Sequence, residues 1–433
     1  MAELPLRVIL LGCGTVGSEV ARALSAPDRA ARLADAAGGP LEVVGIAVAD
    51  PSRERPGMPA HLLTGDAATL VRDAHADIVI ELIGGVDGTV PLIEASFESG
   101  ASVITANKAL LSTHLRRLSS MASDRGLDLY YEAAVAGAIP IVRALRTSLS
   151  GQRLHRVMGI VNGTTNFVLT TMTKDRADYA DVLAKAQELG YAESDPTADV
   201  GGHDAAQKAA ILATLAFGQE VTDADVPREG IEKVTAADLD AAARAGHVVR
   251  LLAIAERVGD GAVSVRVHPA MVPVGHPLAA VDGALNAVFV EGADPGPLMF
   301  LGTGAGGTPT ASAVLGDLIA AARNRRAGTS QRPPTFDDHL ELLPLERLVS
   351  AFYLAVEVAD RPGVLASVAT VFGEHGVSIR SMEQVGLGSD ARLVFLTHEA
   401  SEAAMAATVE DLSELEAVEE IGVLLRIVDG SDS

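Results

Sequence analysis

The chain has 433 residues, 48% of them hydrophobic and 21% charged, which is the composition of a globular protein with two or three domains of about 150 residues each. Its 34 Lys and Arg face 57 Asp and Glu, a formal net charge of −23 that argues against nucleic acid or an anionic membrane as a partner. Cys13 is the only cysteine, which excludes an internal disulfide, and neither a run of ~20 apolar residues nor a signal-peptide pattern is present. We therefore expect a cytoplasmic protein.

The first segment, "LRVILLGCGTVGSEVARAL", places a glycine-rich turn between a short apolar run, Leu6–Leu11, and a helical pattern. Strand, G-x-G-x-x-G turn and helix in this order are typical of dinucleotide binding, because the glycines let a pyrophosphate approach the backbone at the helix N-terminus. A structural glycine turn in an unrelated α/β domain is the alternative. The residues expected to contact the nucleotide are Gly12, Gly14, Thr15, Val16 and Gly17.

Further short apolar runs follow, separated by helical stretches such as "VPLIEASFESG". This alternation predicts a doubly wound parallel sheet of the Rossmann type. The predicted strands are Leu41–Val48, Asp77–Leu82, Ser102–Ala106 and Leu127–Ala133.

The end of the second predicted strand, "VADPSRER", bears on the choice of nucleotide. An acid at this place usually binds the ribose hydroxyls of NAD, whereas arginines accept the 2′-phosphate of NADP. Here Asp50 is followed by Arg53 and Arg55, so both NAD and NADP stay open, and the arginines can also be read as solvated loop charges.

Two further segments place polar groups at the ends of predicted strands. "TANK" puts Asn107 and Lys108 just past the carboxyl end of the predicted strand that contains Thr105, where α/β folds bind ligands, although a lysine there can also be an ordinary exposed loop residue. Glu132 is followed by a loop of small residues before Pro140, which opens a helix. Such a loop either holds a monovalent cation with its carbonyls or merely turns the chain.

The stretch "YAESDPTADVGGHDAAQK" (Tyr191–Lys208) combines four carboxylates with one lysine. Asp204 and Lys208 stand four residues apart at the start of a predicted helix and hence on one face, where a plain ion pair contributes only ~0.3–0.5 kcal/mol. A lysine can also handle the proton of a carbinol, while carboxylates bind an ammonium group. His203 and His268 are weaker candidates as proton carriers, because a loop histidine is more often structural or solvated.

The remaining chain predicts two more regions. Between Gly151 and Val290 we expect helices, including one over Thr235–Gly259, and short strands such as the one in "GAVSVRVHPAMV". The helix "TPTASAVLGDLIAAARNRRA" then packs back on the first sheet, and a linker follows. Beyond it, the order βαββαβ predicts a ferredoxin-like unit.

Several of these motifs together resemble the homoserine dehydrogenase family. They are the glycine fingerprint, "TANK", "EAAVAGAIP", "VNGTTNF" and "GYAESDPTADVGGHDAAQKAAIL", and the likeness runs from Leu6 to about Arg426. The resemblance implies the reversible oxidation of L-homoserine to L-aspartate 4-semialdehyde with NAD or NADP, in threonine and methionine biosynthesis. The entry "DRPGVLASVATVF" into the last unit resembles the ACT domain, a module that binds small regulatory ligands.

The resemblance also implies roles for individual residues. Lys208 resembles the general acid/base and Lys108 a second lysine near substrate and nicotinamide, while "FLGTGAGG", with Gly304, resembles a second glycine loop at the cofactor. The residues that resemble substrate ligands are Tyr191, Glu193, Asp199 and Asp204. The residues that resemble a sodium site are Glu132, Val135, Gly137 and Ile139.

The domain boundaries expected from the sequence follow these motifs. We expect a nucleotide domain over 1–140 that is completed by 300–325, a substrate and dimerisation domain over 141–299, a linker over 326–347 and an ACT domain over 348–428. The implied partners are the amino-acid substrate, threonine as effector, and a further copy of the chain in a homodimer or homotetramer. Two alternatives are another NAD(P)-linked amino-acid enzyme, which leaves Tyr191–Lys208 unexplained, and a non-catalytic amino-acid sensor, against which both lysines argue.

Overall fold

The structure is a computed structural model that describes residues 4–55, 58–337, 339–386 and 391–428. The chain forms two compact units. Unit 1 comprises Met1–Val157, Ala210–Asp225 and Asn286–His339, and unit 2 comprises Met158–Ala209, Val226–Leu285 and Leu340–Ser433. Among the described residues, no helix combines the length and apolar character that crossing a bilayer requires.

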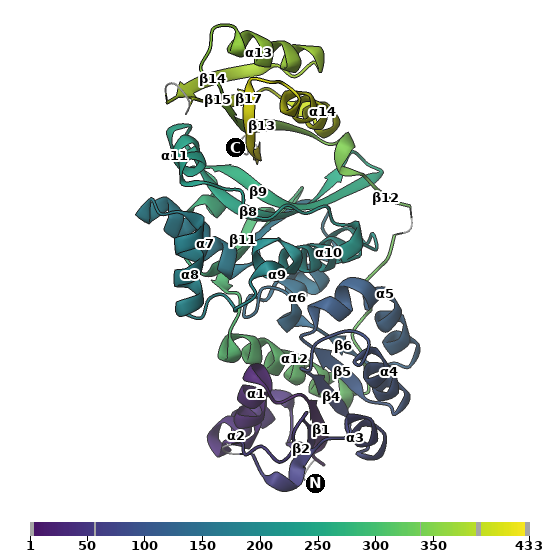
Figure 1. The fold of residues 1–433 in the computed structure, drawn as a ribbon. Coiled ribbons are helices and arrows are strands. Elements are labelled where there is room, and N and C mark those ends of the chain that lie inside the picture. The colour runs from purple at the N-terminus through teal and green to yellow at the C-terminus, as the bar shows by residue number, and fades with distance from the viewer. Residues whose placement is uncertain (1–3, 56–57, 338, 387–390, 429–433) are drawn as a thin grey trace. The chain divides into compact units, whose positions relative to one another are not determined.

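Unit 1 contains the predicted doubly wound sheet (Figure 1). Six strands lie in the order β3-β2-β1-β4-β5-β6, and neighbouring strands are parallel. Strands β1 and β4 are apolar and largely buried, as expected when helices cover both faces of a sheet. The strands are β1 (Leu6–Leu11), β2 (Leu41–Ala47), β3 (Leu63–Thr64), β4 (Ile78–Glu81), β5 (Ser102–Thr105) and β6 (Leu129–Tyr130).

The helices of this sheet include one from far along the chain. Helix α12 contacts α1 and α2, and Ala311, Val314 and Leu318 of α12 join the core cluster of the sheet. The predicted return of the chain to the first sheet is therefore present. The helices are α1 (Thr15–Ser25), α2 (Pro27–Ala37), η1 (Ala60–Leu62), α3 (Ala67–Asp73), α4 (Val90–Glu98), α5 (Lys108–Asp124) and α12 (Gly307–Ala327).

The other elements of unit 1 include β11, β10 and β7, which lie in this order in a second sheet. The helix expected after Pro140 is a single α turn followed by a π-helical turn. The elements are η2 (Glu132–Ala134), α6 (Ile141–Arg143), η3 (Ala144–Ser148), β7 (Leu154–Ile160), which continues into unit 2, η4 (Asp223–Asp225), β10 (Leu285–Gly292) and β11 (Gly296–Thr303).

In unit 2, the helix predicted over Thr235–Gly259 is wrong in its second half. Helix α11 ends at Arg244, Gly246 adopts a left-handed φ of 79°, and the following run is strand β8, which pairs with β9. The β-branched and apolar residues of this run pack on a neighbouring strand, and such tertiary contacts outweigh helix propensity. The elements are α7 (Gly163–Asp175), α8 (Tyr179–Glu188), α9 (Thr197–Val200), α10 (His203–Phe217), which continues into unit 1 at Ala210, α11 (Ala236–Arg244), β8 (His247–Val258), β9 (Ala262–Pro273) and η5 (Pro277–Ala280).

The C-terminal part of unit 2 has the predicted βαββαβ order, with its own apolar core. Its sheet, β17-β13-β15-β14, is continuous with β8 and β9, because β17 pairs with β9 in parallel through Arg426 and Ala270. The elements are β12 (Glu341–Leu342), η6 (Leu345–Arg347), β13 (Val349–Val358), α13 (Val364–Glu374), β14 (Ile379–Val385), β15 (Ala391–Thr397), β16 (Ala400–Ser401), α14 (Glu402–Ser413) and β17 (Val418–Ile427).

The predicted linker is fastened at both of its ends. In unit 1, the N–H of Gln331 donates to the carboxylate of Asp128, and the N–H of Asp337 donates to the carbonyl of Gly218. In unit 2, β12 pairs with β9. The end of the predicted linker is therefore held on the sheet of unit 2.

Candidate functional site

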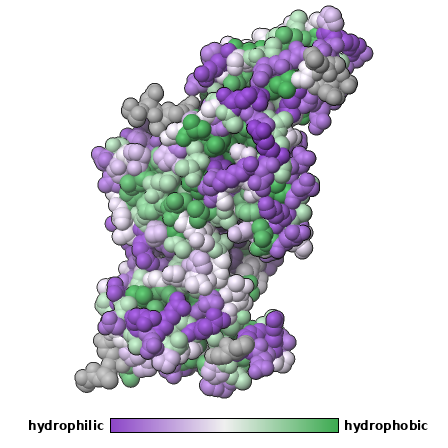
Figure 2. Space-filling view, turned by 90° about the vertical axis from the view of Figure 1, so that its left-hand side faces the viewer, coloured by the Kyte–Doolittle hydropathy of each residue, from purple (hydrophilic) through white to green (hydrophobic). Residues whose placement is uncertain are grey.

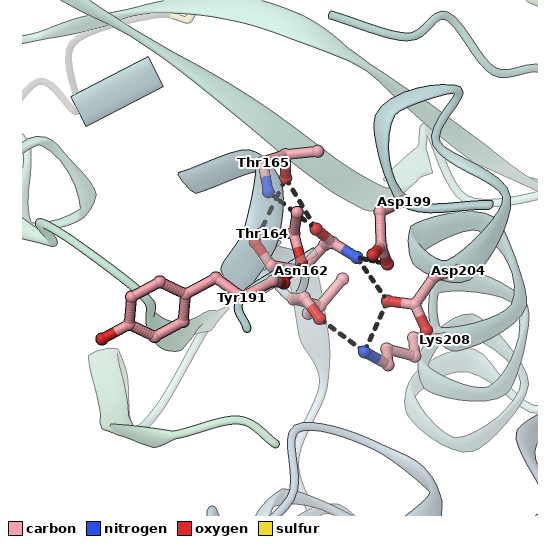
Figure 3. A network of polar contacts seen from close by, with 8 residues as sticks. Asn162, Thr164, Thr165, Tyr191, Asp199, Asp204 and Lys208 are labelled. Carbon is pink, nitrogen blue, oxygen red and sulfur yellow. Dashed lines mark hydrogen bonds and ion pairs between the residues drawn. The ribbon is translucent and has the colours of Figure 1, made fainter. Parts of the chain in front are cut away.

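Lys208 is the centre of a polar cluster in unit 2 (Figure 3). Its Nζ donates to the carbonyl oxygen of Val161 at 2.7 Å and to Oδ2 of Asp204 at 2.7 Å. Both charged side chains are only 11% exposed. The predicted ion pair between residues four apart is thus present, and it is largely shielded from solvent. An ammonium group has three N–H bonds, so two of them fix Lys208 and one remains for a further acceptor.

Asn162 joins the two aspartates of this cluster, and sequence reasoning gave it no role. Its Nδ2 donates to Oδ1 of Asp199 at 2.7 Å and to Oδ2 of Asp204 at 2.8 Å. Its Oδ1 accepts from the N–H of Thr165, which caps α7. The asparagine after a buried strand and before "GTTNF" is a recognisable N-cap signal, but the contacts with both aspartates come from distant parts of the chain.

Asp199 reaches the cluster from α9, a single helical turn that ends at Gly201. The N–H of Thr197 donates to the carboxylate of Asp195, which lowers the pKa of Asp195 and fixes the start of this turn. The double glycine that follows gives the chain a left-handed step, with φ of 78° at Gly202, into α10. The turn therefore lets Asp199 of α9 and Lys208 of α10 join the same polar cluster.

The structure separates the other predicted substrate residues from this cluster. The carbonyl of Tyr191 accepts from the hydroxyl of Thr164, while its ring packs against Phe167 and points away from Lys208 (Figure 3). Glu193 is exposed. His268 is buried, and desolvation holds its pKa well below the usual value, so it is a neutral side chain in the sheet.

The glycine fingerprint in unit 1 has the geometry expected for close backbone approach. A Cβ at Gly12, whose φ is 103°, would lie 2.6 Å from the carbonyl oxygen of Leu82, and a Cβ at Gly17 would lie 2.3 Å from that of Gly12. Gly14 has open space around it and precedes α1 without a side-chain cap. Two glycines are thus required by packing, and the third leaves room at the N-terminus of α1, where an anion is stabilised.

A cavity of about 230 Å³ opens beside this turn. It is lined by Gly14, Thr15, Val16, Glu81, Leu82, Ile83, Gly84, Ala106 and Asn107. Sequence reasoning missed Glu81, the last residue of β4, whose carboxylate accepts from the N–H groups of Ile83 (2.7 Å) and Gly84 (3.1 Å). An acidic residue within the apolar run "DIVIEL" was the available signal.

The hydroxyl of Thr105 donates to the other oxygen of Glu81 at 2.5 Å. Thr105, which the sequence predicts at the nucleotide site, thus fixes a carboxylate that lines the cavity. Asn107 caps α5 through the N–H of Leu110. Lys108, the first residue of α5, is half-buried. Gly304 lies against the loop of Gly137, where a Cβ would come within 2.5 Å of the Gly304 carbonyl oxygen.

The end of β2 favours neither nucleotide outright. The carboxylate of Asp50 accepts from both the N–H and the hydroxyl of Ser52, and these bonds lower its pKa. Arg55 donates to the carbonyl oxygens of Asp50 and Arg53, and its charge acts on the thiol of Cys13 in the glycine turn. Arg53 is exposed.

Glu132 is buried, and its carboxylate faces the start of α6. Its oxygens accept from the N–H groups of Val142 (2.8 Å) and Arg143 (2.9 Å), and its own N–H donates to Asp317. Burial, followed by the charge of Asp317, raises the pKa of Glu132 to about 7. Burial likewise raises the pKa of Asp317 to about 6.

The loop after Glu132 is tightly bent, with positive φ at Ala136 and Gly137, so its carbonyls point in different directions from those of a regular strand. Within the described ranges no group of three or more His, Cys, Asp or Glu side chains is placed to hold a metal ion. A site made from one carboxylate and several carbonyls is a different donor set, suited to a hard monovalent or divalent cation.

Comparison with known proteins agrees with this geometry. Residues 140–319 match the family model for homoserine dehydrogenase, residues 12–132 the model for its NAD binding domain, and residues 352–417 the ACT domain. Homoserine dehydrogenase of Corynebacterium glutamicum is 49% identical over 424 residues, covering 97% of this chain and 95% of that protein. The Mycobacterium tuberculosis protein of the same name is 48% identical, with 98% of both chains covered.

Solved structures show the same relationship. A homoserine dehydrogenase from Thiobacillus denitrificans superposes with a TM-score of 0.92 at 36% identity, covering 99% of both chains. A hyperthermophilic archaeal homoserine dehydrogenase in complex with NADPH has a TM-score of 0.62 at 25% identity, and covers 73% of this chain and 98% of its own.

Proposed function

Since this chain belongs to the homoserine dehydrogenase family, and is thus an oxidoreductase acting on a CH–OH group with a NAD(P)-binding domain, we propose that the cluster of Asn162, Asp199, Asp204 and Lys208 binds L-homoserine and moves its hydroxyl proton. The observation that carries this proposal is the position of Lys208. Its ammonium is held by one carbonyl and one carboxylate, which leaves a third N–H for the substrate oxygen.

Lys208 is proposed as the acid in one direction and the base in the other. When aspartate semialdehyde is reduced, the Lys208 ammonium donates its third proton to the carbonyl oxygen; when homoserine is oxidised, the amine takes the proton from the hydroxyl. Asp204 keeps Nζ in place in both directions at 2.7 Å. The bound nucleotide supplies the hydride chemistry.

The aspartates are proposed as partners of the substrate's ammonium group. A carboxylate has about four acceptor positions, and the Asn162 amide occupies only one of those of Asp199. We assign Glu193, on the exposed loop before α9, and Tyr191 to the outer part of the same site. Lys108 is proposed as a second cation near the substrate, at the start of α5.

The nucleotide is proposed to lie along the cavity beside Gly14, with its pyrophosphate at the N-terminus of α1. We propose that NADP is accepted at least as well as NAD. The support is that Asp50 is already engaged by Ser52, while Arg53 and Arg55 supply positive charge at the end of β2. Thr105 and Gly304 are proposed to shape the nicotinamide end of this site.

A sodium ion is proposed at Glu132, with the carbonyls of Val135, Gly137 and Ile139. The fit rests on burial, because the carboxylate lies in a place where its pKa rises to about 7, and a cation would offset the cost of its charge. The two N–H donors on Glu132 leave further lone pairs for a cation.

The ACT domain is proposed to bind threonine and to give feedback regulation. Support comes from the sequence around the turn at Arg361–Gly363. The N-terminus of α13 follows this turn and suits a carboxylate, and Asp360 precedes the turn and suits an ammonium group, as an amino-acid zwitterion requires. A homodimer or homotetramer is also proposed. Figure 2 shows apolar side chains gathered on one face, and on β11 exposed Met299 and Leu301 alternate with half-buried residues.

The experiment that tests the proposed activity follows the oxidation of NADPH and of NADH, each in turn, with aspartate semialdehyde and the full-length protein. We expect turnover with both nucleotides and the reverse reaction with L-homoserine. Threonine is then added at fixed substrate. No turnover with either nucleotide would contradict the assignment of the site, while turnover that threonine leaves unchanged would contradict only the feedback proposal.

A further inference from the structure

The segment of residues 226–238, which we call the strap, lies between strand β9 and the turn that carries Asp199. The N–H of Glu229 donates to the carbonyl of Val267 at 2.8 Å, and the N–H of Val267 donates back to the carbonyl of Pro227 at 2.9 Å. Two residues later the N–H of Ile231 donates to the carbonyl of Val200 at 2.9 Å. The strap is therefore bonded on one side to the sheet and on the other to α9.

The fit between the strap and the Asp199 turn is close. A Cβ at Gly230 would lie 2.4 Å from the carbonyl oxygen of Val200, and a Cβ at Gly202 would lie 3.4 Å from the carbonyl oxygen of Glu229. Glycine at Gly230 thus lets two backbones touch, while Gly202 is in ordinary contact with the strap and is favoured by its φ of 78°. A displacement of the strap by a fraction of an ångström would press on or release the turn next to Asp199, since close-packed contacts do not absorb such shifts.

The ACT domain contacts the N-terminal half of the strap through one charged bond. Arg426, on β17, donates to Oε2 of Glu229 at 2.6 Å and makes two further bonds, of 3.0 and 2.8 Å, to the carboxylate of Glu402. The Arg426 side chain is 6% exposed, whereas that of Glu229 is 42% exposed. The bidentate bond to Glu402 fixes the guanidinium to the ACT domain, so that Glu229 follows the position of β17.

A second contact holds the C-terminal end of the strap. Asp238 is fully buried and forms a capping box with Thr235 at the start of α11. Its Oδ1 accepts from the hydroxyl of Tyr353 on β13 at 2.8 Å and also from Arg392 on β15. Three strands of the ACT domain thus contact the strap, at two points on either side of Gly230 and Ile231.

We propose that Glu229 and Asp238 are positioning residues through which the ACT domain sets the place of Asp199, and with it the affinity for the amino-acid substrate. The proposal rests on the proposed function for the role of Asp199. The claim that the ACT domain moves α9 through the strap does not depend on that role. A change in β13, β15 or β17 that shifts either contact shifts the strap, and the bond from Ile231 to Val200 passes the shift to α9. Lys208 is fixed by Val161 and Asp204 and is linked to Asp199 through Asp204 and Asn162, so a shift of α9 reaches the proton-handling group indirectly.

The test is Glu229→Gln in the full-length protein, which keeps the shape of the side chain and removes its charge. We expect the KM for homoserine to rise three- to tenfold, while kcat and the KM for the nucleotide stay within twofold. Hydrogen exchange of the amides over residues 197–203 should become faster. Arg426→Lys, which keeps the charge but loses the bidentate bond to Glu402, should change both quantities in the same direction.

Two controls separate positioning from general loss of stability. Glu256→Gln breaks the shielded pair with Arg266 in the same sheet without touching the strap, and Glu383→Gln breaks the exposed pair between the ACT domain and Arg244. Both should leave the homoserine KM and the exchange over 197–203 at wild-type values. Unchanged exchange in Glu229→Gln, or equal effects in Glu256→Gln, would overturn the proposal. Wild-type protein without activity on homoserine would instead contradict the proposed function, and exchange would still decide the mechanical claim.

Discussion

Two pairs of carboxylates, one pair in each unit, have different kinds of hydrogen-bond partner. In unit 2, Asp199 and Asp204 are met by side chains, the amide of Asn162 and the ammonium of Lys208. In unit 1, Glu81 and Glu132 are met mainly by backbone N–H groups. Side-chain partners can change protonation or swing toward a ligand, whereas backbone donors are fixed by the chain. The comparison supports the proposal that the proton chemistry lies in unit 2, while Glu81 and Glu132 fix loops of unit 1 through backbone hydrogen bonds.

The largest effect is expected from replacing Lys208, which tests whether unit 2 carries the proton chemistry. Lys208→Ala should lower kcat at least ~10²-fold, the usual loss on removing a general acid or base, with nucleotide affinity nearly unchanged. Steady-state kinetics and nucleotide titration measure the two quantities. Lys185→Ala, which removes an exposed pair with Asp175, is the matched control and should leave kcat unaltered. Near-normal turnover of Lys208→Ala would place the proton elsewhere.

At Glu132 the expected effect is on stability and its dependence on pH. Its pKa of about 7 lies above the unfolded value of 4.5, so the folded protein binds more protons than the unfolded chain between these pH values. The free energy of unfolding should therefore fall as pH rises through this window, by up to about 3 kcal/mol from this group. Denaturant unfolding at pH 5 and pH 8 measures the difference. Glu132→Gln should reduce it and leave the part contributed by Asp317, whose pKa burial also raises, to about 6.

Sodium sharpens the same experiment. A cation at Glu132 favours the ionised carboxylate, so NaCl should stabilise the protein more at pH 8 than at pH 5, and more than the same concentration of a bulky monovalent cation. Equal stabilisation by all salts at both pH values would indicate screening alone. In that case the loop at Gly137 has only a structural role.

Replacing Asn162 removes the hydrogen-bonded bridge between Asp199 and Asp204 without removing a charged side chain. Asn162→Ala leaves Asp199 and Asp204 facing each other, which should cost about 1–3 kcal/mol and raise the homoserine KM about tenfold. Asn166→Ala removes a buried amide that donates to Val281 and Leu285, and it should destabilise the fold without changing KM. Equal effects of both variants on KM would deny Asn162 its bridging role.

The features that the sequence predicts are those whose contacts join residues close together along the chain. The Rossmann order, the glycines that cannot bear a Cβ and the Asp204–Lys208 pair are local patterns, and the structure contains all three. Asn162 reaches Asp199 and Asp204 across 37 and 42 residues, and no local pattern encodes those contacts. All of β8 lies within the helix that the sequence predicts, for a related reason, since only its pairing with β9 makes it a strand.

A smaller effect is expected at Glu81, one of the two carboxylates that accept hydrogen bonds from backbone N–H groups. Glu81→Gln keeps the shape but weakens charged bonds to Ile83 and Gly84, each by about 1 kcal/mol, so the loop beside the cavity loosens. NADP and NAD should lose affinity by the same factor, since this loop does not contact the 2′ position. Equilibrium titration with both nucleotides measures it, and a selective loss of NADP would contradict this view.

The smallest effect is expected at the exposed arginines. Replacing Arg53 and Arg55 together by alanine should weaken NADP binding by about tenfold at low salt and spare NAD, because only NADP has a phosphate for them to meet. The loss should shrink as ionic strength rises. If the wild type already binds NAD much more tightly than NADP, Asp50 determines the preference and the prediction is wrong.

The pairing of β17 with β9 has a consequence for how the protein is made. A ribosome releases β9 long before it has synthesised β17, so Ala270 and Met271 of β9 lack their partner strand while the nucleotide-binding sheet, whose first strands emerge earliest, can already fold. An unpaired edge invites pairing with other chains. Premature stops or slow translation within the last hundred codons should therefore yield aggregation rather than a trimmed, active enzyme, and a chaperone that shields β9 would be needed most during that interval.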